Sequence, residues 1–422
     1  MKFSPPPHVS GFTCLGCGRS YEYGNMLTCP ACGIGGILDV EYDYDAAGAA
    51  LRARICDPPF DQWRYRELLP ITPDLPLPHL HVGWTPVVQA PRLGRRLGVR
   101  RLSIKDDSRN PTSSFKDRAS SVGVMKALEF GFDTIACAST GNAASSLSGL
   151  AAATGLTSTI FVPERAPEPK VTQLLIFGAT VLKVKGTYEQ AFDLCRQACE
   201  AFGWYNRNSG TNPFLVEGKK TAGLEIAEQC QNQMPDWVVV SVGDGCTIGG
   251  IGKGLREMKR LGFIDRVPRL LGVQAEGANP VFEAFRSGRE MVPSETHTIA
   301  DSIAVGTPRN WRRALSEIKA SCGEMIAVSD GEILEAMRMT GTMAGIFGEP
   351  AGIAGIAGLR RAVEEGIVKE HETVLAVMTG NGLKDIHSAK QAAGMPLCIG
   401  PDLGELSEAL AAAARNVRVP LS

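Results

Sequence analysis

Lys116 stands in the segment NPTSSFKDR (residues 110–118), between a turn rich in Ser, Thr and Pro and a long helical pattern. Two loops that contain glycine, STGN at 139–142 and GDGCT at 243–247, each follow an apolar run typical of a strand. A lysine amine forms an imine with an aldehyde, and backbone amides in glycine-rich loops bind phosphate or carboxylate groups. Together the three segments predict a site for an aldehyde cofactor with a phosphate group, pyridoxal 5′-phosphate (PLP).

Lys116 is the expected imine lysine and catalytic residue. A lysine side chain ordinarily has a pKa of ~10.4, so this amine must be desolvated or lie near other positive charges to react. Phe115 precedes it and gives an apolar setting, and we expect Phe115 to contact the cofactor. A surface lysine in the first turn of a helix would show the same local pattern. Only the combination with the two loops favours the catalytic interpretation.

The loop at 139–146 ends one predicted strand and begins a helix. Free amides at a helix start bind anions, so we expect the carboxylate of an amino-acid substrate at Ser139, Thr140, Asn142 and Ala143. Asn142 can also reach a ring oxygen of the cofactor. An ordinary helix cap uses the same residue types, so this loop alone is a weak signal.

The loop GDGCT is predicted to hold the phosphate of the cofactor. Its residues are Gly243, Asp244, Gly245, Cys246 and Thr247, and glycine lets successive amides converge on one anion. The loop lacks the lysine of an NTP-binding loop and the GxGxxG spacing of a dinucleotide site. We expect Asp244 to point away, because its charge would repel a phosphate, and Cys246 to be a small apolar filler.

Thr379 follows a predicted buried strand, at the end where α/β proteins bind ligands, so its hydroxyl is a candidate partner for the pyridine nitrogen. Glu349 begins another helical pattern and is a further candidate for the same cleft. The six histidines form no cluster in the sequence, and none is assigned a role.

Two CxxC pairs, Cys14 with Cys17 and Cys29 with Cys32, have the spacing of a four-thiolate metal site. We interpret them as a zinc-ribbon-like segment. Four protein ligands leave no open position on a zinc ion, so the predicted role is structural. The alternative is a ribbon without metal, held by its own packing.

The rest of the chain alternates strand-like and helix-like runs, which predicts an α/β protein with parallel sheets covered by helices on both faces. We expect two doubly wound α/β domains with the cofactor in the cleft between them. The larger domain is assigned to residues 46–101 and 205–400, and the smaller one to 102–204. The zinc-ribbon-like module occupies 1–45 and a helical tail occupies 401–422.

The bulk composition sets limits on partners and location. A net charge of −1 gives no reason to expect a nucleic-acid or acidic-membrane partner. The N-terminus lacks the pattern of a signal peptide, and no apolar run approaches the ~20 residues of a membrane span. We therefore expect a cytoplasmic protein whose twelve cysteines are reduced.

The motifs together resemble threonine synthase and its fold type II PLP relatives, from the cysteine pairs to the segment GLKD at 382–385. The resemblance implies that Lys116 forms the imine, Asn142 bonds the phenolic oxygen, and Ser139 and Thr140 help to bind the substrate carboxylate. It also implies that residues 243–247 hold the cofactor phosphate and that Thr379 faces the ring nitrogen. The implied activity converts O-phospho-L-homoserine and water to L-threonine and phosphate, and a homodimer is the implied assembly.

The chain departs from this family pattern in two places. The usual phosphate loop reads like GNAGN, whereas this one reads GDGCT. In addition, Leu215 stands about where threonine synthases carry an arginine that helps to grip the substrate phosphate. Losing that contact should cost about 1.5–3 kcal/mol of binding, the usual contribution of a charged hydrogen bond. Lys219, Lys220 or Arg207 are candidates to compensate, and the sequence does not distinguish between them.

Other functions use the same lysine and loops. A β-replacement enzyme similar to cysteate synthase, or a β-eliminating enzyme similar to the serine/threonine ammonia-lyases, would differ in the shape of the substrate site. A binding module without activity is disfavoured by the intact lysine and loops. A zinc-ribbon nucleic-acid binder is disfavoured by the near-zero net charge.

Overall fold

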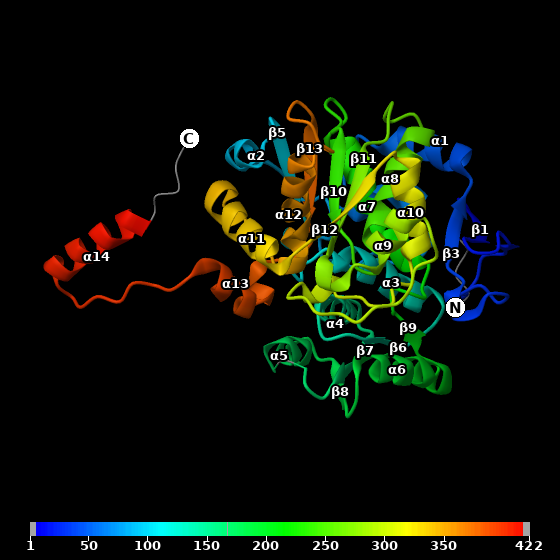
Figure 1. The fold of residues 1–422 in the computed structure, drawn as a ribbon. Helices are drawn as coiled ribbons and strands as arrows, with labels where there is room; N and C mark the ends of the chain where they lie inside the picture. Colours follow the sequence, from blue (N-terminus) through cyan, green and yellow to red (C-terminus); the bar gives the residue numbers. More distant parts are fainter. Residues whose placement is uncertain (1–5, 167, 417–422) are drawn as a thin grey trace.

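The structure is a computed structural model that describes residues 6–166 and 168–416 (Figure 1). Residues 1–5 of the expected N-terminal module, residue 167 of the expected smaller domain and residues 417–422 of the expected tail lie outside the described residues. Two sheets of mainly parallel strands and one small antiparallel sheet organise the chain. No helix in the described part of the chain combines the length and the apolar character needed to cross a membrane.

The larger sheet has six strands in the order β12-β11-β10-β13-β5-β4. Five strands are parallel, and β4 joins the edge in the antiparallel direction. In chain order its strands are β4 (Val87–Gln89), β5 (Arg101–Asp106), β10 (Trp237–Ser241), β11 (Arg269–Ala275), β12 (Glu324–Val328) and β13 (Thr373–Met378). Every residue of β10 is buried, as expected for a parallel strand with helices on both faces.

Alternate residues of β10 serve two separate hydrophobic cores. Val238 and Val240 pack on one face and Val239 on the other. The helices on the first face are α1 (Tyr44–Arg54), α7 (Phe214–Gln229), α8 (Cys246–Arg260), α9 (Pro280–Ser287) and α10 (Trp311–Ala320). The helices on the second face are α2 (Pro91–Leu97), α11 (Asp330–Ala344) and α12 (Pro350–Glu364).

The smaller sheet has four parallel strands in the order β8-β7-β6-β9 and lies at the bottom of Figure 1. Its strands are β6 (Thr134–Ala138), β7 (Thr157–Pro163), β8 (Thr180–Val184) and β9 (Tyr205–Asn206). One face is covered by α3 (Lys116–Glu129), α4 (Asn142–Thr154) and α5 (Glu168–Ile176), and the other by α6 (Tyr188–Phe202). The predicted parallel sheets with helices on both faces are therefore confirmed.

Two strands lie in a different sheet from the one predicted. β5, expected in the smaller domain, pairs with β13 of the larger sheet from Arg101↔Thr373 to Asp106↔Met378. β9, expected in the larger domain, pairs with β6 of the smaller sheet. The boundaries at 101/102 and 204/205 are wrong for these strands. Periodicity identifies a strand, but its partner depends on contacts that are distant in sequence.

The N-terminal segment forms an antiparallel sheet of β1 (Val9–Cys14), β2 (Ser20–Tyr21) and β3 (Leu38–Tyr42). This sheet has no core of its own. The Phe12 ring lies 5.7 Å from the Phe214 ring of α7, and both belong to the buried cluster that covers the first face of the larger sheet. The prediction of a separate module is wrong in this respect, because the segment is too small to bury its own apolar surface.

The last two helices of the described residues are α13 (Ile386–Ala393) and α14 (Leu403–Asn416). α14 agrees with the predicted tail helix. It lies apart from the two sheets at the end of an extended segment (Figure 1).

Candidate active site

One cavity of about 850 Å³ collects almost all of the predicted cofactor and substrate residues. Its lining comes from the start of α3, from the carboxyl ends of β6, β10 and β13, and from the segment 294–309. The predicted residues on the lining are Lys116, Ser139, Thr140, Asn142, Ala143, Gly243, Asp244, Gly245, Cys246, Thr247 and Thr379. The strand ends meet here because parallel strands present their carboxyl ends at the same edge of a sheet.

Phe115 alone among the predicted residues is absent from the lining. Its side chain is fully buried in the core on the first face of the larger sheet, and its backbone N–H donates to the carbonyl oxygen of Thr379 at 2.8 Å. This bond ties the start of α3 to the end of β13. Phe115 therefore positions Lys116 relative to Thr379, and the expectation that it contacts the cofactor has no support in this geometry.

The surroundings of Lys116 favour its neutral amine. Burial, together with the nearby charges of Lys219 and Arg207, lowers the pKa of the amine to about 8. About a tenth of such an amine is neutral at pH 7, far more than for a lysine in water. The side chain can therefore act as a nucleophile and as a base close to neutral pH.

The loop at 243–247 leads directly into α8 and presents the amides of a helix start to the cavity. Gly245 has φ of +94°, and a Cβ atom there would lie 2.6 Å from the carbonyl oxygen of Asn310, so only glycine fits. Asp244 lies on the cavity lining and is held by hydrogen bonds. Its carboxylate accepts the Arg309 N–H at 2.7 Å and the Cys246 thiol at 3.0 Å. Burial raises the pKa of Cys246 to about 12 and keeps it a thiol that donates to Asp244.

Asn142 begins α4 and reaches across to the larger sheet. Its side-chain amide donates to Glu349 Oε1 at 2.6 Å and to Ser302 Oγ at 3.3 Å. Glu349 is buried on the cavity lining, and burial raises the pKa of its carboxyl group. The sequence suggested Glu349 only from its position at a helix start, and its contact with Asn142 required the tertiary structure.

Comparisons with known proteins place the chain in one family. The profile of the family described as "Pyridoxal-phosphate dependent enzyme" matches residues 79–380. The threonine synthase of Methanocaldococcus jannaschii is 38% identical over 405 residues, which cover 94% of this chain and 98% of that protein. The threonine synthase of Methanosarcina acetivorans is 38% identical over 401 residues, with the same coverage of 94% and 98%.

The chain belongs to the threonine synthase family of PLP-dependent enzymes. Solved structures with the same fold include maize serine racemase, with a TM-score of 0.64, 19% identity and coverage of 88% of this chain and 98% of that one. Threonine deaminase isoform 2 from Solanum lycopersicum has a TM-score of 0.63, 22% identity and coverage of 74% and 84%. The predicted fold type II architecture is confirmed. Membership of the threonine synthase family makes the chain a PLP-dependent lyase and does not favour the β-replacement or β-elimination alternative.

Leu215 stands where the family carries an arginine for the substrate phosphate. Leu215 lies on α7, is fully buried and is absent from the cavity lining. Of the three candidates to replace the family arginine, Arg207 and Lys219 line the cavity. Lys220 does not, because its amine lies 2.5 Å from Glu217 and 2.9 Å from Glu257 in a buried ion cluster. The helix turns about 100° between Lys219 and Lys220, so neighbouring lysines face different surroundings.

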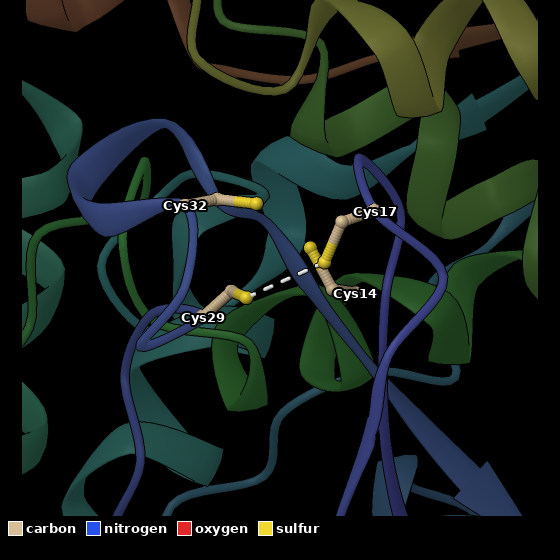
Figure 2. A group of neighbouring side chains, drawn as sticks. All are labelled: Cys14, Cys17, Cys29 and Cys32. Atoms are coloured by element: carbon tan, nitrogen blue, oxygen red, sulfur yellow. Dashed lines mark hydrogen bonds between the residues drawn. The ribbon is translucent and has the colours of Figure 1, made fainter.

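The four N-terminal cysteines of this family member come together as predicted (Figure 2). Their Sγ atoms all lie within 4.8 Å of one another. Each pair ends in a tight turn closed by glycine, since the Gly18 N–H donates to the Cys14 carbonyl and the Gly33 N–H to the Cys29 carbonyl, both at 2.9 Å. Both glycines have positive φ, at 71° and 64°. Four cysteine thiolates are the number and type of ligand that a structural zinc ion takes.

Proposed function

We propose that this protein is a threonine synthase that converts O-phospho-L-homoserine and water to L-threonine and inorganic phosphate, with Lys116 as the reacting lysine. The observation that carries the proposal is a lysine of lowered pKa that shares one cavity with two anion-binding loops. The sequence relatives named threonine synthase, which match over nearly the whole chain, support the choice of reaction.

The cavity residues fit PLP. The Lys116 amine would hold the aldehyde carbon, the amides of Gly243 to Thr247 would hold the phosphate, and the Thr379 hydroxyl would face the ring nitrogen. The Asp244 carboxylate already accepts bonds from the Arg309 N–H and the Cys246 thiol, and the start of α8 would receive the phosphate dianion. When bound, PLP supplies an electron sink that stabilises negative charge on substrate carbons near the amino group.

The protein side chains carry out the proton transfers. The neutral Lys116 amine removes a proton first from the α carbon and then from the β carbon of the substrate, so that the γ carbon–oxygen bond breaks and phosphate leaves. Protons then return to the γ carbon, which becomes the methyl group, and to the α carbon, while water adds its hydroxyl group at the β carbon. The amides at the start of α4 hold the substrate carboxylate and fix the α carbon next to the amine. A neutral hydroxyl at Thr379, in place of a carboxylate, keeps the ring a moderate electron sink.

A substrate panel on the PLP-loaded protein tests this proposal. O-phosphohomoserine, O-phosphoserine with and without sulfite, serine and threonine would be offered, and phosphate, amino acids and keto acids measured. We expect threonine and phosphate in equal amounts from O-phosphohomoserine alone. Turnover confined to a β-substituted amino acid, giving a sulfonate or a keto acid, would refute the assignment.

We also propose that Cys14, Cys17, Cys29 and Cys32 bind a structural zinc ion. Cys29→Ser should lower the zinc content from one ion per chain to none. The melting temperature should also fall, by about 2 °C or more for each kcal/mol of unfolding free energy that the bound zinc contributes. The destabilisation should reach α7, because the N-terminal sheet shares its core. Cys56→Ser, at an exposed cysteine outside the cluster, is the matched control. Equal zinc content and melting temperature in the two variants would contradict the proposal.

We further propose that the enzyme works in the cytoplasm as a homodimer on an amino-acid substrate. All twelve cysteines are unpaired, which agrees with a reducing compartment. The homodimer rests on the family resemblance, and sedimentation of the purified protein would test it.

A further inference from the structure

Two buried cations on the cavity lining, Arg207 and Lys219, have no carboxylate in ion-pair contact within residues 6–166 and 168–416. Each is 1% exposed. Other buried cations of this protein are paired, for example Arg118 with Asp107 and Glu225. A buried charge without a counterion is costly, so its presence at a cavity indicates that the ligand brings the opposite charge.

The electrostatics of the cavity agree with an anionic occupant. Burial lowers the pKa of both Arg207 and Lys219, and Arg207 also lowers the pKa of Lys219. Together with Lys116, three cationic side chains therefore face one space. The Asp244 carboxylate raises the pKa of Lys219 through its charge but forms no ion pair with it. The oxygens of Asp244 already accept bonds from the Arg309 N–H and the Cys246 thiol.

Arg207 is held in a fixed orientation by neutral partners. Its Nε and Nη2 donate to Ser120 Oγ at 3.1 and 2.9 Å, and its Nη1 donates to Ser209 Oγ at 3.0 Å. Ser120 lies four residues after Lys116 on α3, so the guanidinium is anchored on the helical turn that follows the reacting lysine. The serine hydroxyls orient the guanidinium group but carry no charge to neutralise it. The positive charge of Arg207 can therefore pair with an anionic ligand.

Lys219 lies on α7 and lines the same cavity. The Cys246 side chain, in the loop proposed to bind the cofactor phosphate, raises the pKa of the Lys219 amine against the effect of burial. Arg207 instead follows β9 and lies on the side of α3 and the smaller sheet. The reaction proposed here brings two phosphate groups into the cavity, one on the cofactor and one on the substrate. Besides Lys116, the cavity therefore holds two unpaired cations for two phosphate groups.

We propose that Arg207 binds the phosphate group of the phosphorylated amino-acid substrate and determines specificity for it, an assignment that rests on the proposed function. Packing around Gly123 explains how a guanidinium group from position 207 can take the place of the family arginine at position 215. A Cβ atom on Gly123 would lie 2.9 Å from Leu215 Cδ2 and 3.7 Å from Arg207 Cγ, so the two side chains occupy adjoining space beside α3. The guanidinium is supplied from the segment after β9, and the α7 position is filled by an apolar side chain.

Arg207→Met tests the assignment because it keeps much of the side-chain length and removes the charge. The affinity for a non-hydrolysable phosphonate analogue of the substrate, measured by calorimetry on the PLP-loaded enzyme, should fall about 10- to 150-fold, the usual effect of losing charged hydrogen bonds. The KM for O-phosphohomoserine should rise by a similar factor. The PLP absorbance and the melting temperature should stay close to those of the wild type.

Two further variants keep the test decisive. Arg207→Lys retains the positive charge but lacks the planar guanidinium group that can donate two hydrogen bonds to one phosphate. Its affinity for the phosphonate should lie between those of the wild type and Arg207→Met, and it can be measured even if Arg207→Met folds poorly. The double variant Arg207→Leu with Leu215→Arg supplies the guanidinium group from α7, where the family carries it. It should recover at least part of the phosphonate affinity that Arg207→Met loses. Unchanged phosphonate affinity in both Arg207→Met and Arg207→Lys, or loss of PLP binding in place of analogue binding, would overturn the assignment.

The direct binding measurement separates this inference from the proposed function. A wild-type protein that makes no threonine but binds the phosphonate through Arg207 would refute the reaction and support the phosphate site. A wild-type protein that makes threonine with equal efficiency in Arg207→Met would support the reaction and refute the role of Arg207.

Discussion

Replacing Lys116 with alanine is expected to lower threonine formation at least about 1,000-fold, because the same amine reacts with the cofactor and then moves protons. The lowered pKa of about 8 arises from burial and from two neighbouring cations. The measurement is steady-state threonine and phosphate release, together with the visible absorbance of the protein after mixing with PLP.

Lys116→Arg is the stricter variant, since it keeps a positive charge in place but offers no nucleophilic amine near neutral pH. Lys185→Ala, at an exposed lysine, is the control and should match the wild type. The rate of PLP uptake by the cofactor-free wild type should fall about tenfold for each pH unit below about 8, because only the neutral amine reacts. Substantial turnover by either Lys116 variant would remove this lysine from the mechanism.

Replacing Arg118 with methionine is expected to destabilise the fold by about 3–5 kcal/mol, because it leaves the buried Asp107 without an ion-pair partner and Glu225 with only one. Arg118 donates to Asp107 at 2.6 Å and to Glu225 at 2.5 and 2.8 Å, and all three side chains are fully buried. Lys105 is the second cation on Glu225, at 2.9 Å. These contacts join α3, α7 and β5, the elements that carry Lys116 and Lys219 to the cavity.

Arg109→Met is the matched control for this cluster. Arg109 is also bound to an aspartate, Asp106 at 3.0 Å, but its side chain is 68% exposed, so its removal should cost about 0–1 kcal/mol. The shift in urea midpoint of the two variants compares them directly. Equal midpoints would show that the buried cluster does not hold the two sheets together.

The pH dependence of this cluster has a definite sign. Burial raises the pKa of Glu225, but Arg118 and Lys105 outweigh it and bring the pKa down to about 2. An unfolded glutamate has a pKa of ~4.3, so the stabilisation is complete above that pH and is lost as the pH falls towards 2. The difference in stability between wild type and Arg118→Met should therefore shrink below about pH 4.

The sequence was sufficient for features that depend on local backbone chemistry. The turn before Lys116, the glycine loop at 243–247 and the two CxxC turns each need particular residues at fixed spacing, and all three lie where the motifs predicted. The alternation of strands and helices likewise follows from patterns a few residues long. These features could be inferred because each is specified within a short stretch of chain.

Only the tertiary structure decided which distant residues meet. The exchange of β5 and β9 between the sheets, the contact of Asn142 with Glu349 and the shared core of the N-terminal sheet all join segments far apart in sequence. Lys219 and Lys220 are equivalent in the sequence, yet one lines the cavity and the other lies in an ion cluster. The physical reason is that the helix geometry alone fixes the direction in which each side chain leaves the helix. Whether that direction leads to a cavity or to buried carboxylates depends on how the other elements of the fold pack around the helix.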